Sequence, residues 1–261
     1  MIVIKFGGHA MSDEHGAFAQ AISEAIKAGV NPVVVHGGGP QIGEALSSAG
    51  VESKFVGGFR VTTPKILEVV ERVLAGEVGP AVAQSLVVHG VDAVALSGRT
   101  TAMLIAKPLT HFVDGTPADL GHVGVVTSVN PEAVTRLVSE GKVPVISPIA
   151  TDESGSCGYN VNADLAAAAI AGALDAEWLI IMTDVEGIYR NWPDKSSLIA
   201  SISADELESL KASFAEGMAP KVQACLDAIA AGARAVRIID GTNPSALKDA
   251  LLGVGGTLVI A

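Results

Sequence analysis

The chain has 261 residues, of which 49% are hydrophobic and 17% charged, and this balance argues against a disordered protein. Its formal net charge of −11 argues against nucleic acid and anionic membrane surfaces as partners. Two cysteines are too few for a disulfide framework, and their spacing fits no zinc site.

A strand is predicted at the start of the sequence, and no basic segment or cleavage site precedes it, so we expect no signal peptide. No apolar run approaches the length that a membrane span requires. These features predict a cytoplasmic protein.

Strand and helix patterns alternate along the first half of the chain. Strands are predicted at 2–6, 32–36, 91–96 and 143–147, an extended hairpin at 51–62, and small strands and turns over 97–130. Helices are predicted at 12–28, with Ser12 as its N-cap, and at 40–49, 64–75, 78–88 and 131–140. A loop is predicted over 148–159.

The second half repeats the alternation. Helices are predicted at 162–173, 204–213, 217–231 and 244–251, strands at 177–182, 234–239 and 256–260, and a loop at 183–200. Alternating strands and helices predict an α/β fold with an open, mainly parallel sheet and helices on both faces. The loop at 148–159 is the most natural boundary between two lobes, residues 1–155 and 156–261.

Glycine-rich loops follow the first two predicted strands, as Lys5-Phe6-Gly7-Gly8 and His36-Gly37-Gly38-Gly39. Glycine lets the backbone approach a ligand closely, and a helix N-terminus presents unpaired N–H groups to an anion. Neither loop has the spacing of a Walker A or a dinucleotide-binding motif. The pair, with Lys5 on the first strand, predicts a phosphate group held from two sides.

Several further parts of the sequence could serve a function or have a plain structural explanation. Arg60 could grip a carboxylate or be a surface arginine, and Asn162 or Asp164 could cap a helix or orient lysines. The segment Thr183–Gly187 could be a turn or a nucleotide contact. Lys221 stands in the first turn of a helix, where a cation opposes the helix dipole, so an anionic ligand explains it better.

Histidine spacing gives no sign of a metal site. His36, His89, His111 and His122 have no partner four residues away, and we expect none of them to be a metal ligand.

Together these segments resemble the amino acid kinase family, and within it the members that phosphorylate N-acetyl-L-glutamate. The matching segments span nearly the whole chain: Lys5–Gly8, His36–Gly39, Gly58–Thr62, Leu120–Gly124, Asn160–Asp164, Thr183–Gly187 and Gly217–Val222. The chain departs from the family pattern at His9, at Thr63 and at Arg99-Thr100-Thr101, where members usually carry Asn, Asp and Lys-Asp-Gly.

The resemblance implies a carbamate-kinase-like fold with two lobes. The N-terminal lobe, 1–155, would bind the acyl amino acid and dimerise, and the C-terminal lobe, 156–261, would bind ATP. The implied reaction is phosphorylation of the side-chain carboxylate of N-acetyl-L-glutamate by ATP, with Mg²⁺ carried by the nucleotide, in arginine biosynthesis.

The resemblance also implies a role for each site residue. Lys5 and Lys221 would be catalytic and flank the transferred phosphoryl group, and Asp164 would hold both lysines in place. The implied substrate-binding residues are Gly38, Gly39, Arg60 and Asn160; those implied for ATP are Gly7, Gly8, Thr183, Asp184, Val185, Met218 and Lys221. No residue is implied as a metal ligand.

Three alternatives stay open at this point. The chain could phosphorylate another acyl amino acid, such as an aminoadipate derivative of lysine biosynthesis. It could be a nicotinamide-dependent oxidoreductase, which the missing dinucleotide fingerprint disfavours. It could also be a catalytically dead, ligand-binding member, which the presence of Lys5, Lys221 and Asp164 disfavours.

The same resemblance implies how the protein responds to arginine and how it assembles. Arginine-inhibited members carry an N-terminal helix that interlaces dimers into hexamers, and here only Met1 precedes the first strand. A cation at Arg237 would oppose an arginine ligand, although Glu216 could be a remnant of such a pocket. We therefore expect an arginine-insensitive homodimer.

Overall fold

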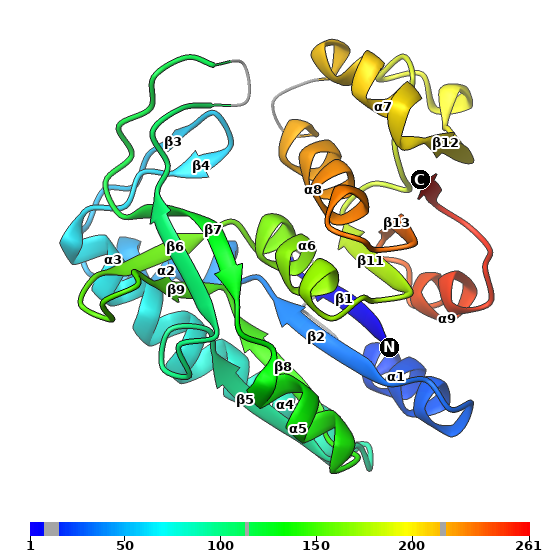
Figure 1. Cartoon of the computed structure of the whole chain (residues 1–261), viewed down its shortest axis with the longest axis horizontal. Coiled ribbons are helices and arrows are strands. Elements are labelled where there is room, and N and C mark those ends of the chain that lie inside the picture. Colours follow the sequence, from blue (N-terminus) through cyan, green and yellow to red (C-terminus); the bar gives the residue numbers. More distant parts are fainter. Residues whose placement is uncertain (8–15, 113–114, 215–217) are drawn as a thin grey trace.

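The computed structural model describes residues 1–7, 16–112, 115–214 and 218–261 (Figure 1). Within them, eight strands form one sheet in the order β12 (Ser201–Ser203), β14 (Thr257–Ile260), β13 (Ala235–Asp240), β11 (Trp178–Thr183), β1 (Ile2–Phe6), β2 (Pro32–His36), β8 (Val143–Ser147) and β5 (Ala93–Ser97). The strands from β13 to β5 run parallel, whereas β14 is antiparallel to β13 and β12 runs parallel to β14. The predicted open, mainly parallel sheet is confirmed.

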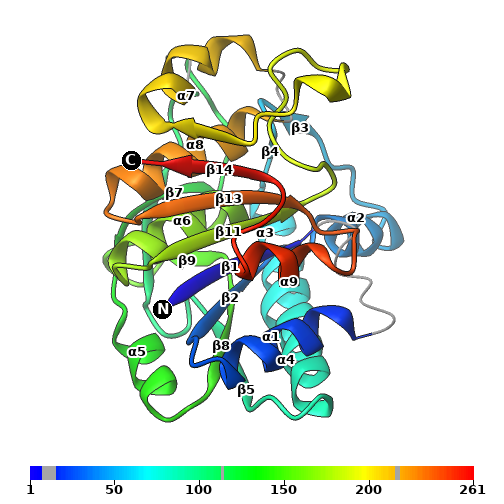
Figure 2. The ribbon, with the colours of Figure 1, turned by 90° about the vertical axis from the view of Figure 1, so that its right-hand side faces the viewer.

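Helices cover both faces of this sheet (Figure 2). One face carries α1 (Ala17–Lys27), α4 (Gly79–Val88) and α9 (Ala246–Leu251); the other carries α5 (Glu132–Ser139), α6 (Ala163–Ala173) and α8 (Ala219–Ala230). The predicted cap of the first helix, Ser12, lies outside the described residues.

The strands contribute to two hydrophobic cores, one on each face, because side chains alternate along a strand. In β1, Val3 packs into the core under α6 and α8, while Ile2 and Ile4 pack into the core under α1, α4 and α9. Strands buried on both faces explain why β1 and β2 are apolar along nearly their whole length.

The helices predicted at 64–75 and 78–88 form one continuous segment. The Thr63 side chain caps α3 (Pro64–Glu71) by accepting from Ile66 N, and a π-helical segment, η2 (Arg72–Val78), joins α3 to α4. The other helices of the described residues are α2 (Gly39–Ser48), which directly follows the second glycine loop, α7 (Ala204–Leu210), and the short 3₁₀ turns η3 (Lys195–Ser197) and η4 (Lys211–Ser213).

A small closed barrel stands beside the main sheet and overturns one prediction. It consists of β6 (Leu104–Pro108), β7 (Val123–Val129), β9 (Ile149–Thr151) and β10 (Gly158–Val161). The predicted loop over 148–159 is therefore wrong, since it contains β9 and the start of β10. Strands this short show no periodic pattern, and pairing with β6 and β7 creates them. A separate hairpin, β3 (Phe55–Val56) and β4 (Phe59–Arg60), matches the one predicted at 51–62.

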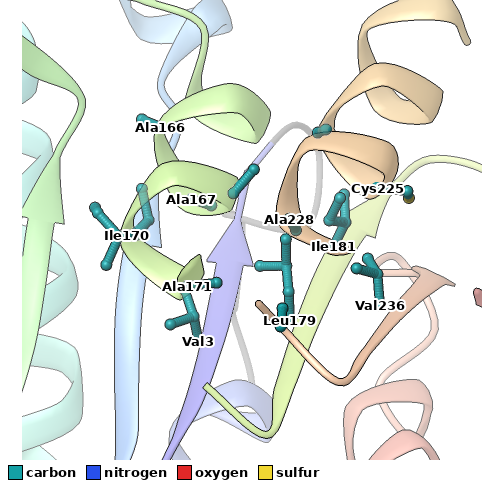
Figure 3. Packing of buried hydrophobic residues seen from close by; sticks show 14 of the residues in the cluster. Val3, Ala166, Ala167, Ile170, Ala171, Leu179, Ile181, Cys225, Ala228 and Val236 are labelled. Atoms are coloured by element: carbon teal, nitrogen blue, oxygen red, sulfur yellow. The ribbon is translucent and has the colours of Figure 1, made fainter. Parts of the chain in front are cut away.

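Small residues bring α6 and α8 close together over β1 and β11 (Figure 3). Ala167 and Ala171 of α6 and Ala228 of α8 are completely buried there. Near the ends of the two helices, a Cβ added to Gly172 would lie only 2.3 Å from the Cβ of Ala231. The first turns of the two helices also lie close together, since Asp164 and Lys221 are in contact there, which matters for the site below.

We predict that Gly172→Ala destabilises the protein by about 1–3 kcal/mol, because the added methyl group forces α6 and α8 apart. The matched control is Gly43→Ala in α2, where an added Cβ meets nothing within 4 Å. That control should be neutral or stabilising by about 0.5–1 kcal/mol, as alanine is the better helix former. Urea unfolding measures both, and a stable Gly172→Ala variant would contradict the packing argument.

Candidate active site

A buried carboxylate between two lysines forms the centre of the site. Asp164 Oδ1 lies 3.0 Å from Lys5 Nζ, and Asp164 Oδ2 accepts a hydrogen bond from Lys221 Nζ at 3.3 Å. Lys5 Nζ also donates to the carbonyl oxygen of Met182 at 3.4 Å. Lys5 and Asp164 are buried, at 7% and 4% exposure. The structure thus brings together three residues that are far apart in the sequence.

Each member of this triad comes from the end of a secondary-structure element. Lys5 lies near the carboxyl end of β1, Asp164 in the first turn of α6, and Lys221 in the first turn of α8. Asn162 is the N-cap of α6, since its Oδ1 accepts from the N–H groups of Asp164 and Leu165. The negative charge of Asp164 suits a helix N-terminus, and its contact offsets the unfavourable position of Lys221.

The pKa of the Asp164 carboxyl reflects this environment. Burial disfavours the charged form and raises the pKa, but the ammonium groups of Lys5 and Lys221 outweigh burial and hold the pKa below its ordinary value. Asp164 is therefore a carboxylate at neutral pH, and the centre carries one negative and two positive charges. The surplus positive charge is available to an anionic ligand.

The two glycine loops lie against each other beside Lys5. A Cβ added to Gly37 would lie 3.4 Å from Gly7 Cα, and one added to Gly7 would lie 2.9 Å from Lys5 Nζ. Gly38 has a φ of 158°, and a Cβ there would lie 2.4 Å from Leu74 Cδ2. The glycines therefore leave backbone close to the Lys5 ammonium group, as an anion-binding loop requires.

A cavity of about 240 Å³ opens next to this centre. Lys5 and Asp164 line it, together with the predicted substrate-binding residues Gly38, Gly39, Arg60 and Asn160. All four of these positions thus face one cavity, which also contains the apolar side chains Ile42, Leu74 and Val123.

Arg60 is held rigidly in the cavity wall. Its guanidinium group donates to Ser53 Oγ at 2.5 Å and to the carbonyl oxygen of Gly39 at 3.1 Å, and it lies 4.5 Å from the centre of the Phe55 ring. Burial lowers the pKa of Arg60 from its ordinary value, yet arginine stays charged at neutral pH. None of these partners is a carboxylate, so the charge of Arg60 is available to a ligand.

Thr62 and Ser53 are contributors that sequence reasoning did not assign a role. Thr62 Oγ1 donates to the carbonyl oxygen of Arg60 at 2.8 Å and accepts from Asn160 Nδ2 at 3.1 Å. It therefore ties the two polar residues of the cavity wall to each other. The position of Thr62 two residues after Arg60 was visible in the sequence, but its contact with Asn160 spans 98 residues.

The predicted nucleotide-binding residues lie at the adjoining strand end. Thr183 ends β11, next to β1, and its Oγ1 donates to Asp184 Oδ1 at 3.0 Å. Val185 follows in the same loop, and Met218 is the N-cap of α8, three residues before Lys221. Gly8, Gly217 and Glu216 lie outside the described residues. Arg237 is not part of the cavity, since it is buried in β13 and donates to the carbonyl oxygens of Gly253 and Gly255.

His36, which precedes the second glycine loop, is completely buried beneath it. Its Nδ1 donates to the carbonyl oxygen of Gly37 at 2.7 Å, and its Nε2 lies 3.0 Å from Ser147 Oγ. Burial lowers the pKa of His36 to about 4, partly offset by the hydrogen bond to Gly37, so the ring is neutral at physiological pH. A neutral ring fixes the loop without adding charge.

Among the described residues, no group of three or more His, Cys, Asp or Glu side chains could hold a metal ion. No helix in the described part of the chain is both long and apolar enough to cross a membrane.

This sheet and this cationic, glycine-lined centre define an α/β protein suited to holding a phosphorylated anion, and comparison with known proteins gives the family. The family model described as "Amino acid kinase family" matches residues 1–240. A protein from Nocardia farcinica named acetylglutamate kinase is 47% identical over 99% of this chain and 86% of its own length. The chain belongs to the amino acid kinase family.

Solved structures share the fold. The N-acetylglutamate synthase of Neisseria gonorrhoeae superimposes with a TM-score of 0.84 at 24% identity, over 100% of this chain and 59% of that one. The carbamate kinase of Giardia lamblia superimposes with a TM-score of 0.71 at 22% identity, over 99% and 97% of the two chains. The expected carbamate-kinase-like fold is confirmed.

We predict that His36 makes folding sensitive to acid. Between about pH 6.5 and about pH 4 the unfolded chain protonates His36 and the folded chain does not, so the free energy of unfolding falls as the pH falls through this window. The full loss is roughly 3 kcal/mol. In His36→Asn this contribution should vanish, so urea unfolding from pH 7.5 to 4.5 should show a shallower slope. Equal slopes would contradict a neutral, buried His36.

Proposed function

We propose that this protein transfers the γ-phosphoryl group of ATP to the side-chain carboxylate of N-acetyl-L-glutamate, which yields an acyl phosphate in arginine biosynthesis. The observation that carries the proposal is the Lys5–Asp164–Lys221 centre, two of whose residues, Lys5 and Asp164, line the same cavity as Arg60 and Asn160. The name of the Nocardia farcinica relative, acetylglutamate kinase, supports the same substrate.

The cavity matches an acyl amino acid in charge and polarity. Arg60, whose hydrogen-bond partners among the described residues are neutral, would bind the α-carboxylate of the substrate through its planar fork of N–H donors. Asn160 would bind the polar groups of the acylated backbone, and Gly38 and Gly39 would offer backbone N–H groups. The side-chain carboxylate would then point toward Lys5, which lines the same cavity.

ATP would approach from the C-terminal half of the chain. Thr183, Asp184, Val185 and Met218 surround the strand and helix ends next to Lys221, while Gly7 and Gly8 would contact the phosphates. Mg²⁺ would arrive with ATP, bound chiefly by phosphate oxygens, as is usual for this ion. The glycine positions beside Lys5, where an added Cβ would reach its ammonium group, fit a bound phosphate chain.

No protein nucleophile is needed, because the substrate carboxylate attacks the γ-phosphorus directly. Phosphoryl transfer then depends on alignment and on neutralising charge that spreads over the transferred group. Lys5 and Lys221 would supply that charge from opposite sides, and Asp164 would hold both ammonium groups in place. We expect these two lysines to act mainly on the transition state.

A panel of acceptors tests the proposed reaction. ADP release is measured with N-acetyl-L-glutamate, glutamate, aspartate and N-acetylaminoadipate. Turnover highest with N-acetyl-L-glutamate is expected. Glutamate and aspartate lack the acylated amine that Asn160 would bind, and the side chain of N-acetylaminoadipate is one methylene longer, which would misplace its carboxylate relative to Lys5. Preference for N-acetylaminoadipate would reassign the acceptor, and no ADP release with any compound would refute kinase activity.

We also infer a two-lobed, cytosolic homodimer. The lobes would be residues 1–155 and 156–261, although the sheet crosses this division where β1 pairs with β11. The end of α4 exposes the apolar side chains Val87 and Val88, which a second copy of the chain would cover. Light scattering of the purified protein measures its mass, and a monomer would refute the homodimer.

We predict that Lys5→Ala and Lys221→Ala each lower kcat by about 10²-fold or more, because charge stabilisation acts mainly in the transition state. The KM values for both substrates should change much less. Lys248→Ala is the matched control, since Lys248 pairs with Glu24 in an exposed contact between α9 and α1. A rise in KM for ATP with kcat unchanged would show that the two lysines only bind nucleotide.

We predict that Arg60→Lys raises the KM for the acyl amino acid about tenfold or more and leaves the KM for ATP nearly unchanged. An ammonium group cannot reproduce the two-pronged contact of a guanidinium group with a carboxylate. Arg72→Lys, at an exposed arginine paired with Glu77, serves as the control. Steady-state kinetics measure the KM for the acyl amino acid and the KM for ATP in both variants. Equal changes in the two KM values of Arg60→Lys would assign Arg60 a structural role instead.

A further inference from the structure

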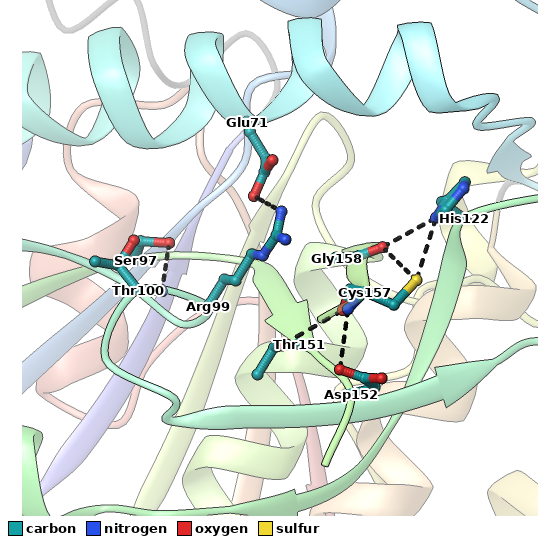
Figure 4. Close-up of polar contacts among 9 residues, drawn as sticks. All are labelled: Glu71, Ser97, Arg99, Thr100, His122, Thr151, Asp152, Cys157 and Gly158. Carbon is teal, nitrogen blue, oxygen red and sulfur yellow. Dashed lines mark hydrogen bonds and ion pairs between the residues drawn. The ribbon is translucent and has the colours of Figure 1, made fainter. Parts of the chain in front are cut away.

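The guanidinium group of Arg99 lies against the backbone of Gly158 at the start of β10 (Figure 4). A Cβ added to Gly158 would lie 2.4 Å from Arg99 Nη1 and 2.8 Å from Arg99 Cζ. The φ of Gly158 is not in the left-handed region, so the backbone conformation does not require glycine there. The missing side chain instead leaves space that the guanidinium group fills.

Arg99 is held from two sides. Its backbone lies in the turn after β5. Two hydrogen bonds close this turn, from Thr101 Oγ1 to the carbonyl oxygen of Ser97 and from Ala102 N to the carbonyl oxygen of Arg99. Arg99 Nη1 forms an ion pair with Glu71 Oε1 at 2.6 Å, and both side chains are about 30% exposed. Neither Arg99 nor Glu71 lines the cavity, so neither can touch a substrate in it.

The pair joins β10 to the far end of α3. Glu71 is the last residue of α3, and Thr62, just before α3 begins, accepts a hydrogen bond from Asn160 in β10. Contacts with β10 therefore flank both ends of the helix. Thr62, two residues before its first residue, bonds to Asn160, and Glu71, its last residue, reaches Gly158 through Arg99. On another side, His122 Nδ1 donates to the carbonyl oxygen of Gly158 at 3.2 Å.

We propose that Arg99, held by Glu71, is a positioning residue that sets the location of Asn160 in the acyl-amino-acid cavity. Gly158 and Asn160 are two residues apart on one strand, and a shift at Gly158 is transmitted along the paired backbone of β10. The inference rests on the proposed function, because it concerns the substrate that Asn160 would bind. It gives a role to the Arg99-Thr100-Thr101 segment, where the chain departs from the family pattern.

A positioning role makes a different prediction from a purely structural one. Loss of Arg99 should raise the KM for N-acetyl-L-glutamate and leave kcat and the KM for ATP nearly unchanged, since Asn160 would bind ground state and transition state alike. A structural role alone would lower thermal stability and reduce the amount of active enzyme, without selective change in one KM.

The experiment compares Arg99→Ala, Glu71→Ala and the double variant. Each single variant should raise the KM for N-acetyl-L-glutamate about fivefold, the effect of losing one partly exposed ion pair. The double variant should be no worse than Arg99→Ala, because the two residues act as one unit. Lys248→Ala, which breaks another ion pair between two elements, is the control and should change no kinetic constant.

Gly158→Ala gives a second, independent comparison. In the presence of Arg99 the added methyl group displaces the guanidinium group, so this variant should raise the same KM. In the Arg99→Ala background the space is free, and Gly158→Ala should have no further effect. Calorimetric titration with N-acetyl-L-glutamate should show the same order of affinities in the absence of ATP.

Two results would overturn the inference. One is a KM for N-acetyl-L-glutamate that stays at the wild-type value in folded Arg99→Ala protein, and the other is additive effects of Glu71→Ala and Arg99→Ala. Failure of the proposed function looks different, because the wild-type protein itself would then not use N-acetyl-L-glutamate. The variants would in that case be compared with the acceptor that the panel identifies.

Discussion

The ion pairs of Asp164 with Lys5 and Lys221 are the interaction on which the site depends. A carboxylate at 4% exposure is costly to bury, and only the two nearby ammonium groups make its charged form favourable. The three charged groups, Lys5, Asp164 and Lys221, come from β1, α6 and α8, so the strand and both helix ends must meet within a few ångströms. Small residues permit that approach, because the alanines of α6 and α8 and Gly172 of α6 let the two helices pack closely. The charged centre at the edge of the sheet therefore depends on how closely the helices pack on one of its faces.

The acyl-amino-acid cavity depends on a second set of contacts, between segments far apart in the sequence. Thr62 joins the Arg60 strand to Asn160 in β10, and Arg99 joins β10 to the end of α3 through Glu71. Beneath the second glycine loop, the neutral ring of His36 fixes the carbonyl oxygen of Gly37. Buried or half-buried polar contacts thus hold the ligand-facing groups in position. Because these groups are in place before a ligand arrives, less conformational entropy is lost when it binds.

Sequence patterns anticipated most of the architecture, and their failures share one cause. The strands of the main sheet are buried on both faces and stand between amphipathic or alanine-rich helices, so their apolar runs are easy to recognise. The sequence predicts a loop where β9 and the start of β10 lie, because strands of three or four residues show no periodic pattern and form only through pairing with β6 and β7. β12, with three residues, was missed for the same reason. Arg99 was noticed only as a departure from a family pattern, since its contact with Gly158 depends on tertiary structure.

The sequence by itself determined the alternation of strands and helices, the parallel sheet, and the glycine loops with Lys5 at the carboxyl ends of its first strands. It could do so because these features depend on local periodicity and on residues close in the chain. Only the tertiary structure decided that Asn162 is the helix cap while Asp164 bridges the lysines, and that Arg60 and Asn160 share one cavity. Those outcomes depend on distances between residues tens to hundreds of positions apart. Such distances are set by how the sheet, barrel and helices pack, which no local pattern encodes.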